Sequence, residues 1–284
     1  IPISFLNTEN TLVIFTPAIP KNHSELMYFK ENNFKVLKRA QVLGMISKNT
    51  FCLAVAGTHG KTTTSAILGH IMKRVNATSF LGGISENYNS NLLLGEDKIC
   101  VVEADEFDRS FLQLYPNIAC ITSMDADHLD IYKEASSLEE SFVTFSQQVS
   151  ETLIVAKGLP LKGLTYAVNE TADYMAFNLK IESGKYIFDV KTPVSEIKNI
   201  EFHLPGKHNV MNALAALAMA DSYGVSLEGI KQRLATFKGV KRRFTYKIKT
   251  NDFVLIDDYA HHPTEIAAVQ NAIREMYPNE KVLV

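Results

Sequence analysis

Cysteine is scarce in this sequence, and neither sign of charge predominates. Only three cysteines occur, Cys52, Cys100 and Cys120, each inside an apolar run and without the paired spacing of a metal site. We expect reduced structural thiols, as in proteins of the cytosol. The 29 Lys and Arg residues nearly balance the 31 Asp and Glu residues, which leaves a net charge of -2. This balance gives no support for binding nucleic acid through a basic surface, and we expect no nucleic-acid partner.

Long hydrophobic runs are also absent. No apolar stretch is long enough to span a membrane, and no secretory signal is apparent, so we expect a cytoplasmic protein without a membrane partner. The length of 284 residues exceeds the usual size of one domain, and 46% hydrophobic residues is ordinary for a globular protein. Because the chain begins with Ile1 rather than Met, we expect a segment of a longer protein. The sequence makes no prediction about whether the protein is a monomer or an oligomer.

Short apolar stretches alternate with helical patterns along most of the sequence. This alternation predicts an α/β fold with a mostly parallel sheet covered on both faces. Residues 164–203 differ, because polar and apolar residues alternate there, and they predict an antiparallel insertion or edge with a hairpin turn at 183–184. The strands are expected at 11–16, 35–37, 51–55, 78–81, 99–103, 118–123, 152–156, 166–168, 173–181, 186–190 and 253–257, and the helices at 24–32, 39–47, 62–75, 137–149, 209–223, 227–237 and 264–276.

A glycine-flanked lysine lies between a predicted strand and a predicted helix, in the stretch GTHGKTTT (57–64). Loop amides and a helix N-terminus can bind phosphate there, Lys61 can reach terminal phosphates, and Thr62 can place an oxygen on Mg²⁺. The stretch lacks the full GxxxxGK[ST] pattern, because the expected first glycine falls on Val55. The alternative interpretation is a chance glycine turn before a helix, but the strand–loop–helix context and three successive threonines favour nucleotide binding.

Two acidic stretches follow predicted strands. Glu103 ends one strand and opens the run EADEFD, at a position where open α/β sheets bind ligands, and it can hold Mg²⁺. The alternative for this run is a solvated acidic loop. His128 lies in DADHLD after the next strand, and an imidazole ligand is unusual for magnesium, so chemistry alone leaves His128 open between a ligand and a surface residue.

A pair of asparagines begins the alanine-rich helix at 209–223. Asn209 and Asn212 are three residues apart and therefore share one helix face, where their amides can read the edge of a purine. The alternative is helix capping, which would explain Asn209 but not Asn212.

Basic and acidic residues also mark the boundary near residue 245. Arg243 in GVKRRF can close onto a phosphate when domains move together, although a solvated basic hinge is the common alternative. In the segment DDYAHHPTE, Asp258 can accept hydrogen bonds from ribose hydroxyls, and His261 can orient a carboxylate or phosphate. A zinc site there lacks spaced partner ligands.

Six motifs in this order resemble the Mur ligase family, whose members are ATP-dependent and form amide bonds in peptidoglycan precursor synthesis. They are GTHGKTTT (57–64), EADEFD (103–108), DADHLD (125–130), GKHNVMN (206–212), GVKRRF (239–244) and DDYAHHPTE (257–265). The resemblance implies the end of a UDP-substrate domain at 1–47, a central P-loop ATPase domain at 48–245, and the start of a Rossmann-like C-terminal domain at 246–284. The glycine-rich turn expected to hold the uridine diphosphate is absent.

The resemblance also implies roles for individual residues. Lys61 and the loop residues bind the β- and γ-phosphates of ATP. Thr62 and Glu103 serve Mg²⁺, and His128 serves a second Mg²⁺. Asn209 and Asn212 flank adenine, Arg243 approaches the γ-phosphate, Asp258 meets ribose, and His261 meets substrate after closure. Lys61, Glu103, His128 and Arg243 are then the catalytic residues, and the loop residues are Gly57, Thr58, His59, Gly60, Lys61, Thr62 and Thr63.

Within the family, the detailed motifs resemble members that join L-alanine to UDP-N-acetylmuramate through an acyl phosphate. Members that attach a preformed tripeptide to the same nucleotide sugar share HHPT and VKRR and are the nearest alternative. Folylpolyglutamate synthase follows the same ligase logic but fits DDYAHHP and DADHLD less well. A P-loop switch or transport ATPase would need the full GxxxxGK[ST] pattern, and a non-catalytic nucleotide-binding module is the remaining class. Because both ends are incomplete by this template, we expect the segment itself to be inactive.

Overall fold

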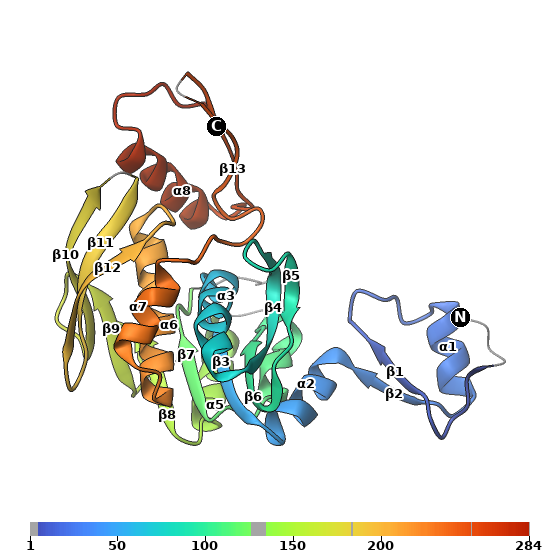
Figure 1. The fold of residues 1–284 in the computed structure, drawn as a ribbon. Coiled ribbons are helices and arrows are strands. Elements are labelled where there is room, and N and C mark those ends of the chain that lie inside the picture. Colours follow the sequence, from blue (N-terminus) through green and yellow to red (C-terminus); the bar gives the residue numbers. More distant parts are fainter. Residues whose placement is uncertain (1–4, 126–134, 183, 251, 284) are drawn as a thin grey trace.

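The computed structural model describes residues 5–125, 135–182, 184–250 and 252–283. A ten-stranded sheet forms its centre, in the order β12-β11-β10-β9-β8-β7-β3-β6-β4-β5 (Figure 1). The strands are β3 (Phe51–Ala56), β4 (Ala77–Ser85), β5 (Ser90–Leu93), β6 (Glu96–Glu103), β7 (Ile118–Ile121), β8 (Thr152–Ala156), β9 (Leu164–Val168), β10 (Tyr174–Glu182), β11 (Lys185–Lys191) and β12 (Glu196–Phe202).

Neighbouring strands from β10 to β4 run parallel, whereas β5 at one edge and β11 with β12 at the other pair in the antiparallel sense. The prediction of a mostly parallel sheet is therefore confirmed. The antiparallel part predicted over 164–203 is confirmed for the β10–β11 and β11–β12 pairs, but it is wrong for β9, which pairs in parallel with both β8 and β10. Gly184 lies in the turn between β10 and β11 with φ of +75°, and Ser183 lies outside the described residues. Strands β5 and β12 were not predicted individually.

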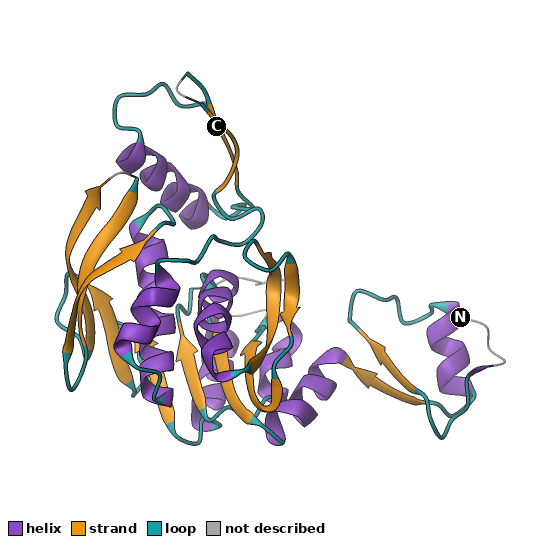
Figure 2. Ribbon diagram, viewed as in Figure 1, coloured by secondary structure: helices purple, strands orange, loops and turns teal. Residues whose placement is uncertain are grey.

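Helices cover both faces of this sheet (Figure 2). Side chains alternate along a strand, so Leu53 and Val55 of β3 face one core, while Cys52 and Ala54 face the other. The first core is completed by α3 (Lys61–Met72), α6 (Lys207–Tyr223) and α7 (Leu227–Leu234), and the second by the 3-10 segment η3 (Phe107–Gln113) and α5 (Ala135–Gln147). A short turn, η2 (Lys73–Val75), follows α3. The three cysteines are buried free thiols, as expected.

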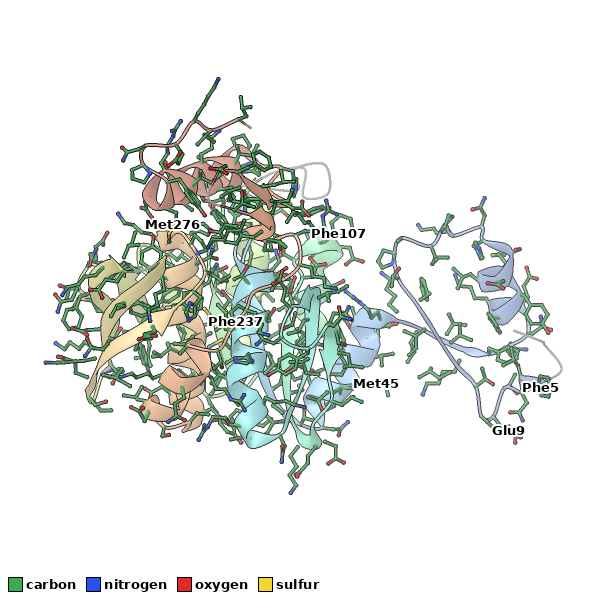
Figure 3. All side chains as sticks on the ribbon, turned by 45° about the horizontal axis from the view of Figure 1, so that its top comes forward. Phe5, Glu9, Met45, Phe107, Phe237 and Met276 are labelled. Carbon is green, nitrogen blue, oxygen red and sulfur yellow. The ribbon has the colours of Figure 1, made fainter. Side chains whose placement is uncertain are left out.

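A small unit precedes the central body and stands apart from it (Figure 1). Strands β1 (Leu12–Phe15) and β2 (Lys35–Lys38) pair in parallel around α1 (Ser24–Glu31). Helix α2 (Arg39–Lys48) leads into β3, and its Leu43 and Ile46 pack against the second core. Figure 3 shows Phe5 and Glu9 on this small unit, away from Phe237 in the body.

The C-terminal part packs against the body at the N-terminal end of α6, where Lys207 lies 3.8 Å from Glu275. Strands β13 (Thr245–Lys249) and β14 (Val254–Asp257) form an antiparallel pair, and α8 (Pro263–Met276) follows. Ala272 of α8 is 1% exposed, and Tyr186 of β11 donates a hydrogen bond to Glu275. Strand β13 was not predicted. The domain boundaries at 47/48 and 245/246 remain predictions.

Candidate functional site

The glycine loop, residues 57–60, joins β3 to α3 at the carboxyl end of the parallel strands. Gly57 and Gly60 have φ angles of +135° and +82°, which side-chain-bearing residues rarely adopt. Space is equally restrictive. A Cβ at Gly57 would lie 2.1 Å from Thr122 Oγ1, and one at Gly60 would lie 2.6 Å from Asn212 Oδ1. Both glycines are therefore required by the backbone conformation and by their neighbours.

Two residues that follow β7 brace the glycine loop. The hydroxyl of Thr122 donates to the carbonyl of His59 at 2.5 Å. Ser123 accepts twice, from the His59 amide to its hydroxyl at 2.8 Å and from the Thr58 amide to its carbonyl at 3.3 Å. The loop is therefore held by a neighbouring strand as well as by its own helix.

Lys61 is the first residue of α3, and its ammonium group contacts two backbone carbonyls and one carboxylate. It donates to the carbonyls of Gly57 at 2.6 Å and Thr58 at 3.3 Å. Its third partner is the carboxylate of Glu106, whose oxygens lie at 2.8 and 2.7 Å. The Glu106 side chain is fully buried, and burial raises its pKa against the opposing effect of Lys61. Glu106 was part of the EADEFD motif, but no role was predicted for it.

Glu103 lies close to Thr62, as predicted for residues that share a ligand. The Thr62 hydroxyl donates to Glu103 Oε1 at 2.9 Å, and the Ser65 hydroxyl donates to Oε2 at 3.1 Å. The amide of Gly82 also donates to Oε2, at 2.9 Å. Carboxylate and hydroxyl oxygens are suitable ligands for Mg²⁺. Within the described ranges, no three His, Cys, Asp or Glu residues are grouped to hold a metal ion, and His128 lies outside those ranges.

Asn209 and Asn212 lie on one face of α6, as the spacing predicted. Asn212 Nδ2 donates to Asn209 Oδ1 at 3.3 Å, and Thr64 donates to Asn212 Oδ1 at 3.2 Å. The capping alternative for Asn209 is wrong, because Gly206 is the N-cap of α6, and Asn209 instead donates to the Pro205 carbonyl at 2.6 Å. The asparagine pair thus packs directly against the start of α3.

The segment after residue 240 brings Arg243 and Asp258 next to the glycine loop and the asparagine pair. Asp258 accepts hydrogen bonds from the amides of Phe244 and Ala260, both at 2.7 Å. The Arg242 guanidinium lies 4.8 Å from the centre of the Tyr259 ring, a cation–π contact. These contacts fix the turn that carries Arg243.

His59 connects the glycine loop with α8. Its Nδ1 lies 3.4 Å from Glu265 Oε1, and its Nε2 lies 3.4 Å from Asp125 Oδ2. The hydrogen bond from His59 is the main reason that the pKa of Glu265 falls to about 2, and Arg243 contributes. Glu265 closes the DDYAHHPTE motif, yet its role was not predicted. His261, which was predicted to meet substrate, is mainly exposed and lies 3.0 Å from the Tyr259 carbonyl.

These segments enclose a cavity of about 280 Å³, here called the loop pocket. Ten of the predicted site residues line it, whereas Gly57, Glu103 and His261 do not. Its lining also includes residues that the sequence analysis did not identify, among them Ser123, Tyr166, His208 and Glu265. The predicted residues in its wall are Thr58, His59, Gly60, Lys61, Thr62, Thr63, Asn209, Asn212, Arg243 and Asp258.

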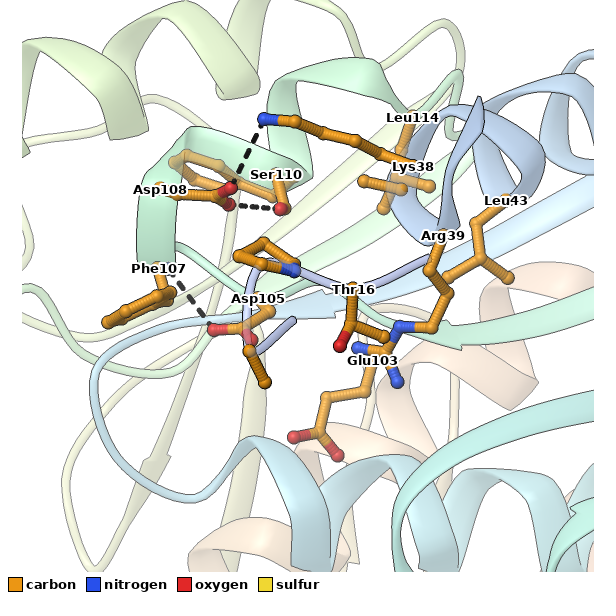
Figure 4. A pocket seen from close by; sticks show the side chains of 14 residues that line it. Thr16, Lys38, Arg39, Leu43, Glu103, Asp105, Phe107, Asp108, Ser110 and Leu114 are labelled. Atoms are coloured by element: carbon orange, nitrogen blue, oxygen red, sulfur yellow. Dashed lines mark hydrogen bonds and ion pairs between the residues drawn. The ribbon is translucent and has the colours of Figure 1, made fainter. Parts of the chain in front are cut away.

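A second cavity of about 330 Å³, here called the Arg39 pocket, lies between the N-terminal unit and η3 (Figure 4). Glu103 lines it, although the same carboxylate bonds Thr62 beside the loop pocket. Lys38 extends toward Asp108, with 3.6 Å between the ammonium and carboxylate. Asp108 has φ of +49°, a backbone conformation uncommon outside glycine. Cationic and anionic side chains therefore share this pocket.

In the part of the chain that the structure describes, no helix is long and apolar enough to cross a membrane.

Comparisons with known proteins fit this geometry. The family described as "Mur ligase middle domain" matches residues 55–220, which include the glycine loop and the asparagine pair. The chain belongs to the Mur ligase family. A second description, "Mur ligase, glutamate ligase domain", matches residues 242–284.

Two relatives share high identity with this member of the Mur ligase family. UDP-N-acetylmuramate–L-alanine ligase of Flavobacterium psychrophilum is 62% identical over 97% of this chain and 62% of that protein. The enzyme of the same name from Christiangramia forsetii is 59% identical over 100% of this chain and 64% of its own length. The chain thus spans less than two thirds of these relatives.

Solved structures also match the fold. UDP-N-acetylmuramate–alanine ligase of Thermotoga maritima has a TM-score of 0.84 at 29% identity, covering 97% of this chain and 67% of that chain. A murein peptide ligase of Psychrobacter arcticus has a TM-score of 0.73 at 24% identity, covering 94% and 64%, which supports the fold alone.

Proposed function

We propose that this chain is the ATP-binding part of a ligase that joins L-alanine to UDP-N-acetylmuramate in peptidoglycan precursor synthesis. The observation that carries the proposal is the loop pocket, where Lys61, the Asn209–Asn212 pair, Arg243 and Asp258 converge from distant parts of the chain. The names of the two relatives supply the substrates. We further propose that the protein is cytoplasmic, in keeping with its buried free thiols.

ATP fits the loop pocket in one orientation under this proposal. Its terminal phosphates lie at the start of α3, where loop amides and Lys61 carry positive charge. Its adenine lies against Asn209 and Asn212, which are both buried in the pocket wall. Asp258 lies where ribose hydroxyls can donate to it, and Arg243 faces the phosphates.

Magnesium is the proposed metal cofactor, and Glu103 with Thr62 would hold it. Their oxygens are hydrogen-bonded at 2.9 Å, and one carboxylate beside substrate phosphates is a usual setting for Mg²⁺. The metal, when bound, would offset negative charge on the transferring phosphoryl group. His128, which lies outside the described residues, stays the proposed ligand of a second magnesium ion.

The chemistry needs activation, because a carboxylate has no good leaving group for amide formation. The lactyl carboxylate of the nucleotide sugar attacks the γ-phosphorus of ATP, and ADP leaves with the electron pair of the broken P–O bond. The acyl phosphate is then attacked by the amine of L-alanine, phosphate leaves, and the amine loses its proton. Lys61 and Arg243 offset the repulsion of the two anions that meet in the first step.

We assign the nucleotide sugar to the Arg39 pocket. This pocket shares Glu103 with the metal site, so a carboxylate placed there lies next to the phosphates of ATP. Lys38 and Arg39 supply positive charge for a substrate that carries a diphosphate and a carboxylate.

The alternatives to this function are a ligase that uses a different amine substrate and a nucleotide-binding module that catalyses no reaction. A tripeptide ligase would accept the same nucleotide sugar, and the names of the high-identity relatives favour L-alanine instead. Phosphate release by the full-length protein, measured with UDP-N-acetylmuramate and either L-alanine or the tripeptide, tests the assignment. Release only with the tripeptide would replace the proposed substrate, and no release with either amine would favour a non-catalytic nucleotide-binding module.

A further inference from the structure

Glu106 has no role in the reaction outlined above, although it contacts a central residue of the loop pocket. It follows Glu103 by three residues, at the N-terminal boundary of η3, and its side chain is 0% exposed. A fully buried carboxylate is costly unless it has a charged partner, and Lys61 is that partner. Its position therefore calls for a functional reason.

The ammonium of Lys61 has three hydrogens and three partner groups. The carbonyls of Gly57 and Thr58 take two directions, and the Glu106 carboxylate takes the third at 2.7–2.8 Å. The Lys61 side chain is only 13% exposed, although Lys61 lines the loop pocket. A terminal phosphate that binds Lys61 therefore meets an ammonium already paired with an anion.

Two anions that share one ammonium in a poorly solvated site repel each other. Without nucleotide, Glu106 supplies the counter-charge that the largely buried Lys61 side chain needs. With nucleotide, phosphate oxygens can supply that charge, so the carboxylate and the phosphate compete for Lys61.

We propose that Glu106 is a positioning residue that acts as the internal counter-ion of Lys61 and is displaced by the terminal phosphates of a nucleotide. The inference rests on the proposed function, because it takes those phosphates as the ligand of Lys61. Glu106 holds the ammonium ready in the nucleotide-free protein and weakens nucleotide binding. It also favours release of ADP, because the carboxylate recovers its partner as the phosphates leave.

The central experiment uses Glu106→Gln, which keeps the size and a hydrogen-bond acceptor but removes the charge. Calorimetric titration with Mg²⁺–ATP and with ADP is expected to show about fivefold tighter binding than in the unchanged protein, because one like charge is gone. Binding of AMP is expected to be unchanged, because its single phosphate lies too far from Lys61. Asp105→Asn is the matched control, since it removes the neighbouring charge without a contact to Lys61 and is expected to change affinity less than twofold.

Thermal unfolding gives a second readout that separates this role from a merely structural one. The free Glu106→Gln protein is expected to melt at a lower temperature, because its buried ammonium has lost a counter-charge. Saturating Mg²⁺–ATP is expected to raise its melting temperature by more than it raises that of the unchanged protein. A structural role alone would lower both temperatures equally.

Two further variants keep the proposal open to contradiction. Glu106→Asp retains the charge at a greater distance and is expected to have intermediate ATP affinity, which also serves if Glu106→Gln does not fold. In a Lys61→Met background, Glu106→Gln should no longer tighten binding. ATP binding by the unchanged protein with equal or weaker binding by Glu106→Gln would overturn this inference alone. No ATP binding by the unchanged protein would overturn the proposed function together with it.

Discussion

The loop pocket and the Arg39 pocket lie on either side of Glu103 but are built differently. The loop pocket gathers side chains from the central sheet, α6 and the C-terminal part, and hydrogen bonds hold its loop and asparagine pair. The Arg39 pocket lies where the N-terminal unit meets η3, and the Lys38–Asp108 ion pair crosses it with Lys38 half exposed. Exposed ion pairs contribute only about 0–1 kcal/mol. The comparison indicates that the proposed nucleotide site is preorganised, whereas the geometry of the proposed substrate site depends on the N-terminal unit.

The largest effect is expected from a substitution in the loop pocket that leaves the Arg39 pocket unchanged. Lys61→Ala should weaken Mg²⁺–ATP binding at least about a hundredfold, because charged hydrogen bonds to phosphate contribute about 1.5–3 kcal/mol each. Calorimetry measures this, with Lys157→Ala as the control, since that lysine pairs with Glu170 on the surface. Undiminished ATP affinity would remove the phosphate site from the glycine loop.

A change at Glu103 should affect both pockets. Glu103→Gln keeps an acceptor for Thr62 but loses the charge proposed to hold Mg²⁺, so the Mg²⁺ concentration for half-maximal phosphate release should rise about tenfold. A magnesium titration of the full-length protein measures the shift. An unchanged midpoint would mean that the metal is held elsewhere.

The Arg39 pocket can be tested without disturbing the loop pocket. Arg39→Ala should weaken binding of UDP-N-acetylmuramate about fivefold, because one cation facing an anionic substrate is lost, and should leave ATP affinity unchanged. Calorimetry with each ligand separates the two sites, and Lys35→Ala on β2 is the control for lost charge. Equal loss for both ligands would indicate that the pockets are not independent.

The smallest effect concerns the acid stability of the contact between the glycine loop and α8. The pKa of Glu265 is lowered from 4.5 to about 2, so its contribution to stability is complete above pH 4.5 and is lost as the pH falls toward 2. Allowing for solvent screening, Glu265→Gln should lower the free energy of unfolding by about 1 kcal/mol at pH 7. Urea unfolding at pH 7 and pH 3 measures this, and the difference between the two proteins should be smaller at pH 3 than at pH 7. A constant difference would assign the effect to something other than ionisation.

Features encoded by local pattern could be predicted from the sequence. The strand–loop–helix around Lys61 follows from a short apolar run, two glycines and a helical period, and the shared face of Asn209 and Asn212 follows from helix geometry. Strand β12 was missed as a separate element, because charged and polar residues occupy its exposed positions and weaken the apolar alternation. Strand β13, with the sequence TYKIK, has the same weakness.

Contacts between distant segments could be predicted only where two residues were expected to share a ligand, as for Thr62 and Glu103. Glu106 and Lys61 are 45 residues apart, and nothing in EADEFD distinguishes the glutamate that meets lysine from the one that meets Thr62. The Glu265–His59 contact likewise depends on how α8 packs against the body. The capping interpretation of Asn209 failed because Gly206 already ends the preceding turn with a φ of +93°.

The brace that Thr122 and Ser123 give the glycine loop has an engineering consequence. The loop is short of the common GxxxxGK[ST] pattern, and some of the hydrogen bonds that shape it come from residues more than 60 positions away. Residues 57–64 grafted into another strand–helix junction would therefore keep the sequence of the motif but not its backbone conformation. A graft that preserves the loop conformation would need both the glycine loop and the segment that contains Thr122 and Ser123.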